Sequence, residues 1–84
     1  MASIILYALS TERAISSIER RNTLTLVVSR TATKKQIKQE VEKQFNAKVS
    51  AVSTLITPTG KKKAFVRFAK AGEAADVASK LKII

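Results

Sequence analysis

The sequence has no cysteine and no histidine, and it has only two glycines and one proline. The first absence excludes disulfides, the common zinc and haem sites, and catalysis by a Cys or His nucleophile. The scarcity of glycine and proline argues against a flexible linker or a low-complexity tail. We therefore expect the 84 residues to form one domain, residues 1–84, with a single modest core.

Long hydrophobic runs are also missing. The run Ile4–Leu9 follows no basic leader and is far shorter than the ~20 residues that span a bilayer. We expect neither a signal peptide nor membrane insertion, so a cytoplasmic protein is the default interpretation.

Acidic residues are scarce: six Asp and Glu stand against sixteen Lys and Arg, which gives a net charge of +10. Solubility alone is normally met by a net charge of about 2–8, so this excess indicates a nucleic-acid partner. The acids form no catalytic cluster, because Glu40 and Glu42 do not share a helix face. Glu73 and Asp76 suit the first turn of a helix. We expect no enzyme activity, no cofactor, no metal and no small-molecule substrate.

Hydrophobic periodicity and turn residues predict seven elements. They are a strand at 4–7, a helix from Ser10 or Thr11 to Asn22, a strand at 23–29, a helix from Thr31 or Thr33 to Asn46, strands at 48–58 and 62–69 joined by a turn at Pro58 and Gly60, and a helix at 72–84. The alternation in 48–58 slips between Val49 and Val52 and again at Leu55–Ile56, which predicts a bulge or two buried faces. This order is typical of an α/β (α+β) domain with a mostly antiparallel sheet.

The apolar positions of these elements form the predicted core. They are Ala14, Ile15, Ile18, Leu24, Leu26, Val28, Ile37, Val41, Phe45, Ala64, Val66, Phe68, Ala74, Val77, Ala78 and Leu81.

The excess positive charge falls in two blocks. The first is Arg30, Lys34, Lys35 and Lys38; the second is Lys48, Lys61, Lys62, Lys63, Arg67 and Lys70, within an acid-free stretch. Lys34 and Lys35 fall in the first turn of a predicted helix, where each cation opposes the helix dipole by ~0.3–1 kcal/mol. Such a helix start favours a phosphate, although two lysines that simply reach into water give the same pattern.

Phe65 lies between Lys63 and Arg67 on the strand face opposite the predicted core. A base or ribose can pack on such a ring while the cations neutralise phosphates; alternatively, a helix covers Phe65. "KKKAFVRF" partly matches the central strand of an RNA-recognition motif, but Lys62 and Lys63 replace its Gly and its first aromatic. Gly60-Lys61 lacks the spacing of a phosphate loop.

Three stretches together resemble the family of large-subunit ribosomal protein twenty-three. They are Ser10-Thr11-Glu12-Arg13, the stretch from Ala32 to Leu55, and the basic hairpin from Gly60 to Arg67. The likeness covers nearly the whole chain. It implies a three-layer α/β/α domain with a four-stranded antiparallel sheet, which matches the order of strand, helix, strand, helix, strand, strand and helix. It also implies a structural, rRNA-binding constituent of the large ribosomal subunit at the rim of the polypeptide exit tunnel.

The resemblance and the charge pattern together give two sets of candidate residues. The rRNA-binding set is Arg30, Lys34, Lys35, Lys38, Thr54, Lys61, Lys62, Lys63, Phe65 and Arg67, with large-subunit rRNA and neighbouring ribosomal proteins as partners. The factor-docking set is Ser10, Thr11, Glu12 and Arg13, of which Glu12 matches an acid associated with chaperone docking in bacterial members.

The turn at Thr57–Lys62 is too short for the tunnel loop of the bacterial members and resembles the archaeal form. Signal recognition particle is therefore the expected exit-site factor. Two alternatives remain open, a free single-stranded RNA-binding protein and a scaffold that binds only protein.

Overall fold

The computed structural model describes residues 4–81, and its elements follow the predicted order. They are β1 (Ile5–Ala8), α1 (Glu12–Arg21), β2 (Thr23–Val28), α2 (Lys34–Phe45), β3 (Val49–Ile56), β4 (Lys62–Phe68) and α3 (Glu73–Lys80). The turn between β3 and β4 is as short as the sequence predicts. Residues 82–84 of the last predicted helix lie outside the described residues.

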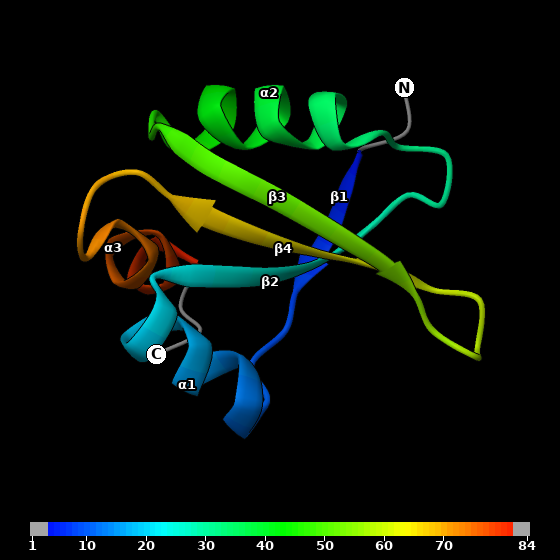
Figure 1. Ribbon diagram of the computed structural model, residues 1–84, viewed down its shortest axis with the longest axis horizontal. Helices are drawn as coiled ribbons and strands as arrows, with labels where there is room; N and C mark the ends of the chain where they lie inside the picture. Colours follow the sequence, from blue (N-terminus) through cyan, green and yellow to red (C-terminus); the bar gives the residue numbers. More distant parts are fainter. Residues whose placement is uncertain (1–3, 82–84) are drawn as a thin grey trace.

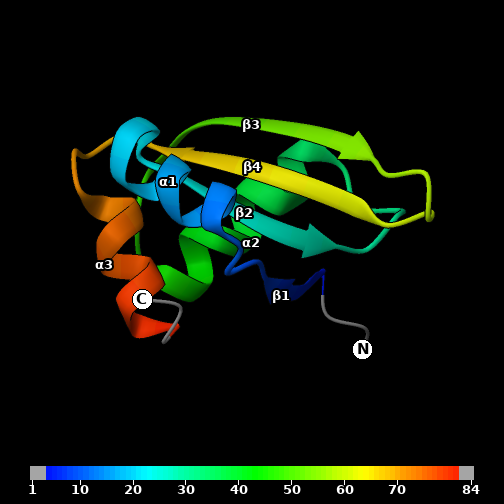
Figure 2. The ribbon, with the colours of Figure 1, turned by 90° about the horizontal axis from the view of Figure 1, so that it is seen from below.

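The four strands form one antiparallel sheet in the order β1-β2-β4-β3. Helix α2 lies on one face of this sheet and α1 on the other, as Figure 1 shows. Helix α3 lies beside α1, at the end of the sheet opposite the β3–β4 hairpin (Figures 1 and 2). The predicted three-layer α/β/α architecture is confirmed.

The main core lies between the central strands and the helices α2 and α3. On the sheet it contains Leu24, Leu26, Val28, Ala64, Val66 and Phe68, and on the two helices it contains Ile37, Val41, Ala74, Val77 and Ala78. These predicted positions are confirmed. The prediction for Leu81 was wrong: α3 ends at Lys80, and Leu81 lies beyond its last turn with 39% of its surface exposed.

Strand β3 is an edge strand, which explains its irregular pattern. A register shift between Val49 and Ala51 confirms the first predicted slip. No shift occurs at Leu55 and Ile56, which pair regularly with Lys63 and Lys62. Both side chains are instead exposed at the edge of the sheet.

Polar residues fix both ends of the first two helices. Thr11 caps α1 by accepting a hydrogen bond from the Ala14 amide, at 3.3 Å. Thr33 caps α2 in a reciprocal capping box with Gln36, at 3.0 and 3.1 Å. Asn22 and Asn46 end the helices in the left-handed region, at φ 52° and 51°, a conformation that asparagine tolerates well.

Asn22 also joins segments that are distant in the sequence. Its Nδ2 donates to the carbonyl oxygens of Phe68, at 3.1 Å, and Lys70, at 2.7 Å. Its Oδ1 accepts from the Ala74 amide, at 2.9 Å, at the start of α3. One side chain therefore holds the α1–β2 junction against the β4–α3 junction.

We expect Asn22→Gly to lower the free energy of unfolding by about 1.5–4 kcal/mol, because it removes three hydrogen bonds worth ~0.5–1.5 kcal/mol each. Glycine accepts the positive φ without strain, so the loss measures the hydrogen bonds. Asn46→Gly is the matched control, since the Asn46 side chain has no hydrogen bond within residues 4–81. Urea unfolding compares them, and equal losses would contradict this role for Asn22.

Candidate nucleic-acid interface

The sheet register brings part of each basic block together, whereas Lys48, Arg67 and Lys70 lie toward the opposite end of the sheet. Val28, the last residue of β2, pairs with Lys62, the first residue of β4. The loop that leaves β2 therefore lies against the β3–β4 hairpin, and α2 begins at the same end of the molecule (Figure 1). We call Arg30, Lys34, Lys35, Lys61 and Lys62 the hairpin-end cluster.

Two contacts join the blocks directly. The Lys62 ammonium group donates to the carbonyl oxygen of Ala32, at 2.6 Å. The guanidinium group of Arg30 lies over the hairpin, since a Cβ atom placed on Gly60 would be 3.8 Å from its Nη1. The Lys62 ammonium group therefore already has a hydrogen-bond partner within the protein, although the sequence placed Lys62 among the cations expected to bind rRNA.

The hairpin turn is held by its own hydrogen bonds. The Thr57 amide donates to the Lys61 carbonyl at 2.8 Å, and the Gly60 amide donates to the Thr57 carbonyl at 2.9 Å. The Thr57 hydroxyl accepts from the Lys61 amide at 3.1 Å, and Gly60 has a φ of 85°, which favours glycine. This ordered turn holds the backbone of the exposed Lys61, whose ammonium group lies 3.4 Å from the Tyr7 hydroxyl.

Lys34 and Lys35 occupy the first turn of α2, as predicted, and both side chains are exposed. No acid lies in that turn. The capping box already uses the Gln36 amide, so the amides of Lys34 and Lys35 are the donors left for an anion. Lys38, one turn further along, is also exposed.

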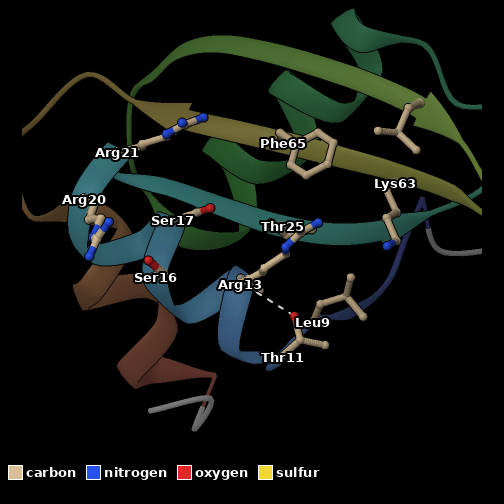
Figure 3. Close-up of a pocket in the computed structure, with 12 residues that line it drawn as sticks. Leu9, Thr11, Arg13, Ser16, Ser17, Arg20, Arg21, Thr25, Lys63 and Phe65 are labelled. Carbon is tan, nitrogen blue, oxygen red and sulfur yellow. Dashed lines mark hydrogen bonds between the residues drawn. The ribbon is translucent and has the colours of Figure 1, made fainter.

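A groove lies between α1 and the neighbouring face of the sheet (Figure 3). We call it the α1 groove; its volume is about 620 Å³. Arg13, Arg20 and Arg21 of α1 and Lys63 of β4 line it, together with Phe65, and no acidic residue does. Within residues 4–81 these four cations form no hydrogen bond or ion pair through their side chains.

The structure decides between the two interpretations of Phe65, an open ring or a ring covered by a helix. Phe65 is half-buried beside α1 and lines the groove, so the helix flanks the ring without covering it. Arg67 is exposed on the same face of the sheet, where it pairs with Thr23 and Ala51. Thr54 pairs with Ala64 on the opposite face, away from the groove.

The sequence did not indicate the arginines of α1 as part of this site. Arg20 and Arg21 fall in the last turn of α1, where the helix dipole favours cations, so their positions need no ligand to explain them. A usable signal existed in the spacing of residues 13, 16, 17 and 20, which share a helix face beside the buried Ala14.

The four residues of the factor-docking set have different structural roles. Thr11 caps the helix, whereas Ser10 and Glu12 are exposed at its start. Arg13 lines the α1 groove with Phe65. Ser10 and Glu12 are therefore the members of the set most available to a partner.

None of the helices within residues 4–81 has the length and apolar character that a membrane crossing requires. In the same part of the chain, no three His, Cys, Asp or Glu side chains are placed together to hold a metal ion.

The fold and its cationic groove define a small, strongly basic α/β domain. The family model of Ribosomal protein L23 matches residues 3–82. A curated relative, the large ribosomal subunit protein uL23 of Pyrobaculum aerophilum, is 51% identical over 74 residues, 88% of this chain and 91% of that protein. The chain belongs to the ribosomal protein L23 family.

Family membership confirms a structural role in the large ribosomal subunit. The protein is a non-enzymatic component of the ribosome, and its location is the ribosome in the cytoplasm. The match covers 91% of the relative, so that protein is about as short as this chain.

We expect Lys62→Met to destabilise the protein by about 1–2 kcal/mol. The substitution keeps the length of the side chain but removes the hydrogen bond from the charged ammonium group to the Ala32 carbonyl. Hydrogen bonds to charged groups contribute ~1.5–3 kcal/mol, and partial exposure to solvent lowers this contribution. Lys61→Met is the control, because Lys61 is exposed and its own hydrogen bond, to the Tyr7 hydroxyl at 3.4 Å, is long and open to solvent. Thermal unfolding at equal salt compares them; equal stability of both variants would show that the hydrogen bond to Ala32 contributes nothing.

Proposed function

We propose that the chain is fixed on large-subunit rRNA, at the rim of the exit tunnel, chiefly through the hairpin-end cluster. The observation that carries this proposal is that parts of two separate basic blocks, the members of the hairpin-end cluster, lie at one end of the sheet. Cations gathered there repel one another, and RNA phosphates remove that repulsion while releasing counterions.

The exposed side chains that can contact phosphate are Arg30, Lys34, Lys35 and Lys61, the last of which would give up its 3.4 Å hydrogen bond to the Tyr7 hydroxyl. Lys62 contributes by holding the 29–33 loop in place through Ala32. Lys38 and Arg67, both exposed, extend the contact surface along α2 and β4. Such contacts fix the position of a protein on folded RNA without reading its sequence.

The short, hydrogen-bonded turn supports a position at the rim of the tunnel. An arm that ends at Thr57–Lys61 grips RNA near the body of the protein and does not extend far from it. Membership of the family favours this assignment over a free single-stranded RNA-binding protein and over a scaffold that binds only protein.

The start of α1 is the proposed docking surface for an exit-site factor such as signal recognition particle. Ser10 and Glu12 are exposed there, and α1 lies on the sheet face opposite α2 (Figure 1). Glu12 is an acid on a strongly basic protein, so it remains available to a cationic partner when the basic surfaces hold RNA.

Replacing Arg30 and Lys61 together by glutamine tests the rRNA interface. We expect the slope of log affinity against log salt to fall by about two units, one for each phosphate that the protein no longer neutralises. The control is Lys43→Gln with Lys80→Gln, which removes the same charge from exposed sites at the ends of α2 and α3. Filter binding to large-subunit rRNA gives both slopes; equal slopes for the two pairs would refute the proposed contact surface.

Replacing Glu12 by glutamine or lysine tests the docking surface. We expect both variants to assemble into large subunits normally but to recruit less signal recognition particle, with the greater loss for lysine. Glu19→Lys is the matched control, since Glu19 is exposed on the same helix. Co-sedimentation measures recruitment, and undiminished recruitment by Glu12→Lys would count against this surface.

A further inference from the structure

The α1 groove is separate from the hairpin-end cluster and has its own composition. Arg13 and Arg21 reach from α1 toward the side of the sheet that carries Phe65, while Lys63 stands on the same strand as the ring (Figure 3). The four cations of the groove are unpaired within residues 4–81. This concentration of unneutralised charge favours an anionic occupant.

The groove also contains an aromatic ring, that of Phe65. The cross-strand neighbours of Phe65 are Thr25 and Ser53, which are too small to cover it. Thr25 is buried and lines the groove, whereas Ser53 is exposed on the edge strand, so neither neighbour closes the ring off from the groove. A half-covered ring among cations is the arrangement on which an unstacked base packs.

The size and the polar groups of the groove limit the occupant further. A volume of about 620 Å³ is within the range of small-ligand sites, ~300–1,000 Å³, and is too small for a duplex. The hydroxyl-bearing residues Ser16 and Ser17 also line it and offer hydrogen-bond partners to a ribose or a base edge.

We propose that the α1 groove holds a single unpaired nucleotide of RNA, with its base against Phe65 and its flanking phosphates on Arg13, Arg21 and Lys63. This inference rests on the proposed function, because the nucleotide belongs to the rRNA that the hairpin-end cluster grips. It adds a stacking contact to a surface that otherwise neutralises phosphates. An acidic peptide satisfies the cations but leaves the open face of the ring without a planar partner.

The test is chemical probing of deproteinised large-subunit rRNA, with a reagent that modifies the base edges of unpaired nucleotides. The full chain is compared with Phe65→Leu, which keeps apolar bulk, and with Phe65→Tyr, which keeps the ring. Ile56→Ala controls for loss of an exposed apolar side chain, since Ile56 is 59% exposed and pairs with Lys62 on the other sheet face. Thermal unfolding verifies that each variant folds.

We expect at least one unpaired base to be protected by the natural chain, by Phe65→Tyr and by Ile56→Ala, and to regain reactivity with Phe65→Leu. The affinity of Phe65→Leu falls by roughly 5- to 150-fold, the range for loss of one base stack. Arg13→Gln weakens protection of the same base and lowers the salt slope by about one unit.

Other outcomes overturn the inference in distinguishable ways. If Phe65→Leu binds rRNA as the natural chain does and leaves every protection unchanged, the groove holds no base, while the proposed function stands. If the natural chain does not bind the rRNA at all, the proposed function fails and this inference fails with it. If a glutamate-rich peptide binds with an affinity that depends on Phe65 and no base is protected, the occupant is a protein.

Discussion

The antiparallel register between β2 and β4 is the constraint on which the rest of the molecule depends. It pairs Val28 with Lys62 and Thr25 with Phe65, so it brings the 29–33 loop to the hairpin and turns the ring toward α1. A shift by one residue would reverse every side chain of β4. Phe65 and Lys63 would then point into the main core, and Ala64 and Val66 toward α1.

Within residues 4–81, the positively charged side chains lie outside the hydrophobic core. Both faces of β2 are covered, and Leu24–Val28 are buried throughout. The cations gather instead around the hairpin and along the uncovered part of the β3–β4 face. Like charges at this density cost folding free energy in isolation, and Lys34 and Lys35 also oppose the dipole of α2. A bound polyanion would relieve both costs, so the proposed binding to rRNA would also stabilise the fold.

Local features could be predicted from the sequence because they depend on neighbouring residues. The caps at Thr11 and Thr33, the helix ends at Asn22 and Asn46, and the alternation of Ala64, Val66 and Phe68 all belong to this class. The sequence did not predict the exposure of Leu81, because the helical spacing of apolar residues continues past Lys80, where α3 ends.

Contacts between distant segments could not be predicted in the same way. The bonds from Asn22 to Phe68 and Lys70 span 46 and 48 residues, and the Lys62 contact with Ala32 spans 30. The α1 groove depends on how a helix lies over a sheet, so from the sequence Arg20 and Arg21 looked like helix-end charges and Arg13 was assigned to the factor-docking set. The most direct measurement of the whole account is lysine acetylation, compared between the free chain and the assembled large subunit. We predict that Lys34, Lys35, Lys61 and Lys63 lose reactivity in the subunit while Lys43 and Lys80 keep theirs; protection of Lys43 and Lys80 with continued reactivity of the other four would contradict the proposed interface.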